Sequence, residues 1–177
     1  GGTSERIAVE CPVPVVVVRD AAPFARWARR EAPLRVLLAV DFTESSDSAI
    51  RFTGLLRAAG PTELTVGHVF HPGVSSRYGL EPLEIPDDPD ASVEALLRRD
   101  LARLVGDIGG DGPVVYRPYQ GEGRIGDHVL EMASDERAAL VVVGTRRKRG
   151  YRRLASVSGV ILHHGKVSVA CAPRVAP

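Results

Sequence analysis

The sequence predicts an α/β fold: a five-stranded, mainly parallel open sheet with helices on both faces, plus an extra N-terminal strand that pairs antiparallel with the last strand. Two observations carry this prediction. Short runs of β-branched and aliphatic residues alternate with helical patterns from residue 34 to residue 172. In addition, one unit, a helix followed by a valine-rich strand, occurs both at the start of the chain and at its end.

Five apolar runs supply the strands of the parallel series. The first, Leu34–Val40, is almost entirely apolar, as expected for a strand that is buried on both faces of a parallel sheet. It is followed by a polar segment, residues 41–46, whose side chains can accept hydrogen bonds from the first N–H groups of a helix. The other four runs are residues 63–70, 113–119, 140–143 and 167–170.

Amphipathic patterns between these runs predict the helices. Apolar residues within 49–56 share one side of a helix that stops near Gly60. Those within 93–108 recur at steps of one, three and four, which predicts a second amphipathic helix. A third helix is expected after the turn at residues 121–123, and the last one starts at Ser156, whose hydroxyl can cap it.

Residues 71–90 interrupt this series. They are rich in proline and show no sustained hydrophobic period. The segment is longer than most connections in a compact domain, which favours a mobile lid or an insertion.

The first 33 residues do not continue the series but repeat its last unit. Residues 4–19 look like the end of a helix followed by a valine strand, and residues 156–171 have the same layout. Asp20–Pro33 is rich in alanine, arginine and proline and is expected to be a linker. Phe24 and Trp27, three residues apart, are expected to fix this linker to the domain through one helical turn.

The composition excludes several classes of protein. Hydrophobic residues make up 44% and charged residues 25% of the chain, which is typical of a globular domain and argues against disorder. Two cysteines cannot build a disulfide scaffold or a multi-cysteine zinc site. No apolar run reaches the roughly 18–20 residues that span a bilayer, and no secretory signal is visible, so we expect a cytoplasmic location and no membrane partner. The net charge of +1 argues against a nucleic-acid partner.

Short motifs at the predicted strand ends resemble those of the universal stress protein family. They are Val36–Val40 with Asp41, Ser46 and Ala49; His68–Phe70; Val141–Arg146; and Ser156–Ser158. The resemblance covers residues 34–172, and the opening residues resemble the family's final helix and strand. It implies the following organisation: residues 1–19 as the end of a truncated preceding repeat of a tandem protein, 20–33 as a linker, 34–172 as the domain and 173–177 as a tail.

The family dimerises through antiparallel pairing of its final strands, which implies a partner for the last strand of this chain. We expect residues 12–18 to lie antiparallel against residues 167–171, either within one chain or swapped between two, as a pseudo-dimer or a homodimer. Pro12 and Pro14 remove ladder donors, so this extra strand is expected at an edge of the sheet.

The resemblance and the expected topology both place a nucleotide site in the crevice beyond the strand ends at Asp41 and Gly144. Asp41 can accept hydrogen bonds from ribose or adenine, Val69 can offer an apolar wall to a purine, and the N–H groups near Ser156 can receive phosphates. The predicted nucleotide-binding residues are Asp41, Phe42, Val69, Gly144, Arg146, Ser156 and Val157. The implied ligand is ATP or another adenine nucleotide, and the role of Mg²⁺ stays open.

The chain departs from the phosphate motif of ATP-binding family members, which is Gly, two residues, Gly, nine residues, Gly, and then Ser or Thr. Gly144 matches the first glycine and Ser156 the final hydroxyl. Arg147 and Ala155 stand where the other two glycines belong, and seven residues separate them instead of nine. Side chains at these positions obstruct a close approach of the backbone to phosphate, so the sequence predicts a degenerate site.

No catalytic or metal-binding residues are predicted. Ser45, Ser46 and Ser156 have no histidine and acid nearby in the sequence that would complete a nucleophilic triad. The spacing of His68 and His71 on a strand end points their rings to opposite faces.

Three functions stay open at this point. They are a stress-response regulatory module that binds a nucleotide, a nucleotide-hydrolysing or nucleotidyl-transferring enzyme of the same superfold, and a structural dimerisation domain. The arginine-rich run at residues 146–153 favours a solvated loop first and an anion site second. The sequence offers no general base, metal cluster or Lys–Ser/Thr phosphate pair, which favours the binding module over the enzyme.

Overall fold

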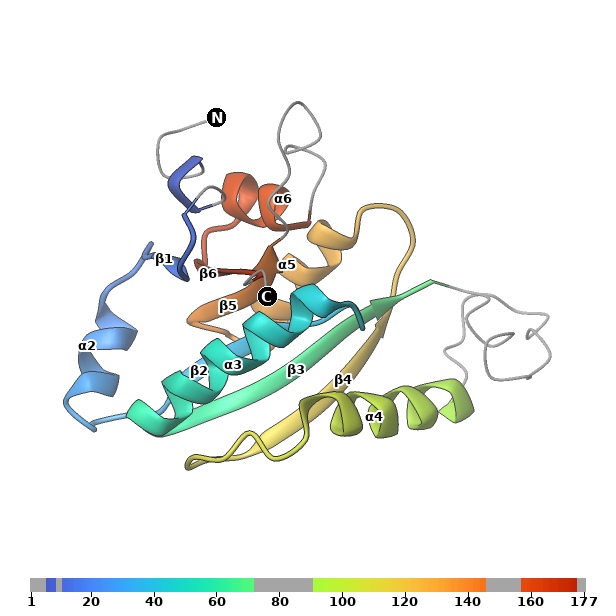
Figure 1. Cartoon of the computed structure of the whole chain (residues 1–177), viewed down its shortest axis with the longest axis horizontal. Coiled ribbons are helices and arrows are strands. Elements are labelled where there is room, and N and C mark those ends of the chain that lie inside the picture. Colours follow the sequence, from blue (N-terminus) through green and yellow to red (C-terminus); the bar gives the residue numbers. More distant parts are fainter. Residues whose placement is uncertain (1–5, 9–10, 72–90, 146–156, 175–177) are drawn as a thin grey trace.

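The structure, a computed structural model, describes residues 6–8, 11–71, 91–145 and 157–174. These form one six-stranded sheet with the strand order β1-β6-β5-β2-β3-β4 (Figure 1). The strands are β1 (Val15–Val17), β2 (Leu34–Ala39), β3 (Thr62–Phe70), β4 (Val114–Gln120), β5 (Leu140–Thr145) and β6 (Ser168–Pro173). All neighbours are parallel except β1, which runs antiparallel to β6, so the predicted fold class is confirmed.

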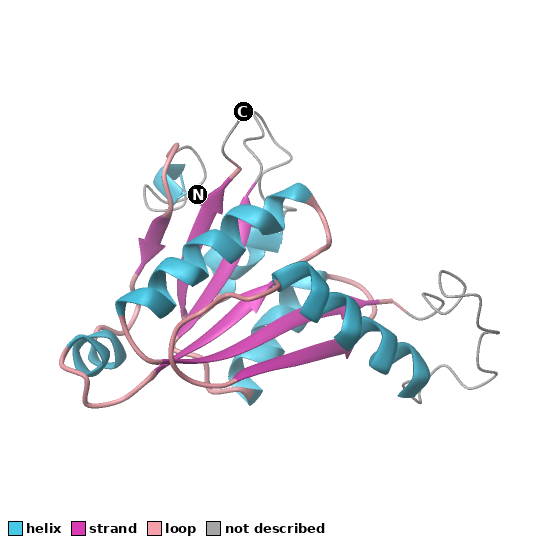
Figure 2. Ribbon diagram, turned by 60° about the horizontal axis from the view of Figure 1, so that its bottom comes forward, coloured by secondary structure: helices cyan, strands magenta, loops and turns pink. Residues whose placement is uncertain are grey.

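Helices cover both faces of this sheet (Figure 2). They are α2 (Ala22–Ala28), α3 (Glu44–Ala59), α4 (Ala91–Val105), α5 (Ile125–Asp135) and α6 (Val157–His164). Because successive strand residues point to opposite faces, β2 contributes to two cores: Val36 and Leu38 pack with α3 and α4, while Leu37 packs with α5 and α6. We call these two sides the α3/α4 face and the α5/α6 face. None of the helices in the described ranges is long and apolar enough to cross a membrane.

The extra N-terminal strand pairs with β6 as predicted. Val15 lies opposite Cys171, and Val17 lies opposite Val169. The strand is three residues long, shorter than the expected span of residues 12–18. On one side, prolines at positions 12 and 14 lack the N–H groups that a ladder needs. On the other, the Arg19 N–H donates to the side-chain hydroxyl of Ser168 at 3.0 Å instead of continuing the ladder.

The linker contacts the domain through the two aromatic residues singled out in the sequence. Phe24 and Trp27 both pack against the core of the α3/α4 face. They lie on α2, a helix of seven residues and therefore longer than the single turn expected. The indole of Trp27 lies against Gly60, just after α3, where a Cβ atom would come within 2.5 Å of Nε1. Gly60 therefore leaves space for the indole that no other residue type would leave.

A buried arginine closes the amino-terminal edge of the sheet. Arg57, near the end of α3, is only 4% exposed. Its guanidinium donates to the carbonyl oxygens of Gly109, Gly110 and Gly112 at 2.5, 3.1 and 3.0 Å, and to Thr62 Oγ1 at 2.9 Å. The φ angles of +75° at Gly110 and +102° at Gly112 lie in the left-handed region, which allows this loop to turn its carbonyls toward Arg57.

Candidate functional site

The winding of the sheet reverses between β2 and β5. The chain runs from β2 outward to β3 and β4, and then returns to β5 on the other side of β2. The two strands are parallel, with Ala39 opposite Val143, so the segments that follow them emerge at the same carboxyl-terminal edge. Asp41 and Gly144 both lie at this edge. Ligands of doubly wound sheets bind at such switch points, and we therefore take this edge as the candidate site.

Asp41 organises the turn that leads into α3. Its Oδ1 accepts hydrogen bonds from the Thr43 N–H at 3.1 Å, the Thr43 hydroxyl at 2.6 Å and the Ser46 hydroxyl at 2.9 Å. The Asp41 N–H in turn donates to Ser46 Oγ at 3.0 Å. A carboxylate at this position also faces the positive end of the helix dipole. Asp41, which the sequence predicts as a ribose or adenine acceptor, thus stabilises this turn in the protein without a ligand.

Phe42 fills the space between β2 and β3 on the α3/α4 face. Its φ angle is +57°, a left-handed conformation that is uncommon for a residue with a side chain. The ring meets the His68 ring edge-on, with centroids 4.6 Å apart and an interplanar angle of 74°. His68 Nδ1 lies 2.9 Å from the carbonyl oxygen of Val40, which can only accept, so this nitrogen carries the proton. The ring of Phe42 also packs against Phe70.

Val69 belongs to the opposite side of the sheet. It is 7% exposed and packs in the core of the α5/α6 face together with Met132 and Val143. The structure therefore places two of the predicted site residues, Phe42 and Val69, on different faces. Only Val69 shares its face with α6, whose start is the predicted phosphate position.

Gly144 is required by the packing of α3. A Cβ atom at this position would lie 1.9 Å from the carbonyl oxygen of Ser45, in the first turn of the helix. No rotation of a side chain relieves a contact with backbone, so only glycine fits while α3 keeps its place. On the α3/α4 face, the gap between β5 and the start of α3 is thus closed by the Ser45 backbone.

Thr145, the last residue of β5, carries a polar atom that the protein leaves unused. The residue is 3% exposed, and within the described part of the chain its Oγ1 has no hydrogen-bond partner. Alternation with Val143 places its side chain on the α5/α6 face. An unpaired buried hydroxyl costs on the order of 1–3 kcal/mol, which a ligand oxygen could offset. Thr145 does not stand out in the sequence, although it directly follows Gly144 in the stretch that carries the family resemblance.

The remaining predicted site residues are Arg146, Ser156 and Val157, and the structure describes only the last of them. Val157 begins α6 and is half-buried. Arg146 and Ser156 lie outside the described residues, as do Arg147 and Ala155. The start of α6 is packed against α5 through a glycine contact: a Cβ atom at Gly126 would come within 2.6 Å of Val160 Cβ.

An ion pair that the sequence did not indicate borders the site. The Arg174 guanidinium contacts the carboxylate of Glu44, the first residue of α3. The Arg174 N–H donates to the carbonyl oxygen of Thr145 at 3.0 Å, which fixes the chain beyond β6 beside the end of β5. The edge therefore carries an ion pair between the first residue of α3 and Arg174, whose backbone is bonded to that of Thr145.

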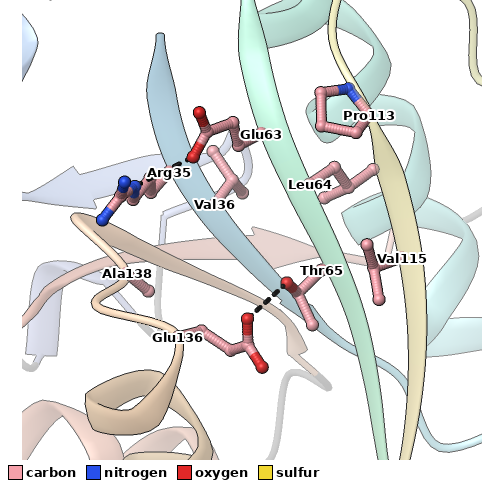
Figure 3. A pocket seen from close by; sticks show the side chains of 9 residues that line it. All are labelled: Arg35, Val36, Glu63, Leu64, Thr65, Pro113, Val115, Glu136 and Ala138. Atoms are coloured by element: carbon pink, nitrogen blue, oxygen red, sulfur yellow. Dashed lines mark hydrogen bonds and ion pairs between the residues drawn. The ribbon is translucent and has the colours of Figure 1, made fainter.

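A pocket of about 150 Å³ lies on the α5/α6 face toward the amino-terminal ends of the strands (Figure 3). Its charged groups are already paired: Arg35 with Glu63 at 2.9 Å, and Glu136 with the Thr65 hydroxyl at 3.2 Å. Ligand pockets usually measure roughly 300–1,000 Å³, so this one is small for a nucleotide. Across the described ranges, no three His, Cys, Asp or Glu side chains gather in a way that could hold a metal ion.

Comparisons with known proteins agree with this architecture. The family model described as the universal stress protein family matches residues 34–173. A universal stress protein from Archaeoglobus fulgidus superposes with a TM-score of 0.65 at 20% identity, covering 97% of this chain and 53% of that one. This chain thus spans about half the length of that relative.

Two further solved structures were determined with a nucleotide. A universal stress protein in complex with cAMP has a TM-score of 0.58 at 22% identity, with 81% of this chain and 98% of that chain covered. An Arabidopsis thaliana universal stress protein family protein with AMP bound has a TM-score of 0.51 at 18% identity, with 80% and 92% covered. A search of curated proteins gave no match. Because the family model spans most of the sequence, the chain belongs to the universal stress protein family.

Proposed function

We propose that this protein is a stress-response regulatory module that binds an adenine nucleotide at the carboxyl-terminal edge of the sheet, between β2 and β5. The single observation that carries the proposal is the buried, unpartnered Thr145 hydroxyl at the point where the winding reverses. Membership of the family and the cAMP and AMP seen in two of its relatives support an adenine nucleotide as the ligand.

The proposed site divides between the two faces of the sheet. The α3/α4 face is closed by Phe42 and by the contact of Gly144 with Ser45, so the phosphates are assigned to the α5/α6 face. There the Thr145 hydroxyl would donate to a phosphate oxygen, and the first N–H groups of α6 near Val157 would add to it. Arg146 and Ser156 are proposed to complete the phosphate contacts. Substitution of two motif glycines makes the site degenerate, which favours a nucleotide with few phosphates over ATP.

The module is proposed to regulate by occupancy and not by chemistry on a substrate. The Ser45 hydroxyl lies 2.6 Å from the Thr43 hydroxyl, and the Ser46 hydroxyl donates to the Asp41 carboxylate, so neither serine faces a histidine base. We propose a cytoplasmic location for the module.

Assembly through the terminal strands is a second proposed role. β1 pairs with the outer edge of β6, which is the position that a strand from a second domain or from a second copy of the chain would take. We therefore propose that the protein works as a homodimer or a pseudo-dimer joined at this edge. Sedimentation velocity of the 177-residue chain distinguishes the two, because only the homodimer doubles the mass.

Isothermal titration tests the nucleotide site. AMP, cAMP and ATP are titrated, with and without Mg²⁺, into the wild type, into Thr145→Val and into the control Thr65→Val, which removes a hydroxyl from the pocket of Figure 3. We expect Thr145→Val to weaken binding by about tenfold or more, the value of a hydrogen bond to a charged group, and Thr65→Val to leave it unchanged. Absence of heat with every nucleotide, for a folded wild type, overturns the proposal. Release of phosphate over time supports the enzyme instead.

A further inference from the structure

Two histidine rings contact the backbone carbonyl oxygens of two consecutive residues in the turn between β4 and α5. His71 Nδ1 lies 2.8 Å from the carbonyl oxygen of Gly121, and His128 Nε2 lies 2.6 Å from that of Glu122. The Gly121 N–H donates to the carbonyl oxygen of Phe70 at 2.9 Å. The turn, residues 121–124, is thereby tied to the end of β3 and to the first turns of α5.

Both ring nitrogens of His128 face groups that can only accept. Nε2 meets the Glu122 carbonyl oxygen, and Nδ1 lies 2.8 Å from Oε2 of the Glu131 carboxylate. Glu131 Oε2 also accepts from the Tyr119 hydroxyl at 3.1 Å. A neutral imidazole has a single N–H and could donate in only one of these contacts. With Glu131 ionised, both contacts are hydrogen bonds at once only when His128 is an imidazolium.

The surroundings of His128 are tightly packed and predominantly acidic. The ring lies against Gly121, where a Cβ atom would come within 2.5 Å of Cδ2, and its centroid is 5.7 Å from that of Tyr119. The side chain is 19% exposed. The titratable and charged groups around His128 and its partners are Asp127, Glu131 and Asp135 on α5, Tyr119 and Arg117 on β4, Glu122 and Arg124 in the turn, and His71 after β3.

These contacts shift the acid–base properties of the pair in opposite directions. The hydrogen bond to the Glu122 carbonyl, followed by that to the Glu131 carboxylate, raises the pKa of His128 above its ordinary value of 6.5, against a smaller effect of burial. The hydrogen bonds from His128 and from Tyr119 lower the pKa of Glu131. The two directions agree, because each partner stabilises the charged form of the other.

We propose that His128 is a proton-operated latch: as the imidazolium it fastens the β4–α5 turn to α5, and on losing its proton it releases the turn. The remaining proton stays on Nδ1, because the Glu131 carboxylate is the stronger acceptor, so the proton leaves Nε2 to solvent. The Nε2 lone pair then faces an oxygen lone pair of the Glu122 carbonyl at 2.6 Å, and this contact is repulsive. The released turn leads directly into Gly126, which packs against Val160 of α6. The latch therefore acts on the helix pair of the α5/α6 face, and it operates whether or not a nucleotide binds.

The pH range of the latch follows from linkage. A histidine whose pKa is higher in the closed state than in the open state contributes stability that is fully present below pH 6.5. This contribution is lost as the pH rises through the closed-state pKa. The turn is thus closed under mildly acidic conditions and opens toward alkaline pH, by about tenfold in the opening equilibrium for each unit of difference between the two pKa values.

The latch is tested by following the ring and the turn separately on the full chain. Side-chain NMR gives the titration midpoint of His128. Hydrogen exchange of the turn amides, corrected for the intrinsic effect of pH, reports opening. We expect His128 to titrate above the ordinary histidine value of 6.5 and the turn to lose protection at that same midpoint.

Two variants separate the latch from a merely structural contact. Glu131→Gln offers a carboxamide N–H that can donate to the neutral Nδ1, so we expect it to keep the turn protected at alkaline pH, where the wild type opens. His128→Gln removes the pH step altogether, while His164→Gln leaves it in place. A wild-type turn with no step in protection, or a Glu131→Gln variant that opens at the same pH as the wild type, overturns the proposal.

Discussion

The two edges of the sheet satisfy their buried polar groups in different ways. At the amino-terminal edge, the Thr62 hydroxyl and the carbonyls of Gly109, Gly110 and Gly112 are bonded to Arg57, while the buried Trp27 Nε1 beside Gly60 has no partner among the described residues. At the carboxyl-terminal edge, the Thr145 hydroxyl is equally buried and, within the described residues, unbonded. The threonine at the first edge is thus satisfied by the chain itself, whereas the threonine at the second edge retains hydrogen-bonding capacity that the folded protein does not use. Buried polar groups that lack a hydrogen-bond partner are expected at functional sites.

Replacing Arg57, which binds the polar groups of the amino-terminal edge, is expected to have the largest effect on the stability of the protein. Arg57→Met removes the donors to the carbonyls of Gly109, Gly110 and Gly112 and leaves these carbonyls unpaired. We expect a loss of about 3–5 kcal/mol in the free energy of unfolding, measured by chemical denaturation. The control, Arg51→Met, removes an exposed arginine of the same helix and should change stability by less than about 0.5 kcal/mol. Equal effects of the two variants would show that the loop is held by something other than Arg57.

The glycine contact at the carboxyl-terminal edge gives the next largest effect. Gly144→Ala forces a Cβ atom into the Ser45 carbonyl, and we expect a destabilisation of about 1–3 kcal/mol, as for an overpacked core. Gly54→Ala is the matched control within α3. Its new Cβ atom meets only ordinary contacts, the nearest at 3.8 Å from Ile108, and a helix interior favours alanine. A Gly144→Ala protein as stable as the wild type would mean that α3 can move away from β5.

One buried threonine at each edge, Thr62 and Thr145, gives the smallest and sharpest test. Thr62→Val removes a satisfied hydroxyl and leaves an Arg57 donor unpaired, which should cost about 1–2 kcal/mol. Thr145→Val removes an unsatisfied one, so we expect the thermal midpoint of the protein without ligand to stay unchanged or to rise. A thermal shift assay compares both with the wild type. If Thr145→Val destabilises as much as Thr62→Val, the proposed asymmetry between the edges does not exist.

Most of the fold could be predicted because its signals are local. Buried strands such as β2 are continuous apolar runs, and the helix stops fall at glycines such as Gly60. The pairing of β1 with β6 followed from the need to cover a sheet edge. The exact length of β1 did not follow, because it depends on a tertiary hydrogen bond between Arg19 and Ser168.

For the candidate site, the sequence predicts which strand ends meet but not the contacts made there. The ends of β2 and β5 lie side by side, as the alternation of strands and helices predicted. The individual roles could not be read from the sequence, because they depend on contacts between distant segments. Asp41 bonds within its own turn, Gly144 makes room for a helix backbone, and Thr145 stands out only by its missing partner. Arg57 was missed for the same reason, since nothing in its helix reveals the loop that it binds.

The helix α3 is fixed at both of its ends by contacts with glycine. Ser45 in its first turn rests directly on the backbone of Gly144, and Gly60 just beyond its last turn lies against the indole of Trp27. Neither contact leaves space for even a methyl group, so a larger residue at either glycine would have to displace one end of the helix. Movement of α3 along its own axis is therefore opposed at both edges of the sheet.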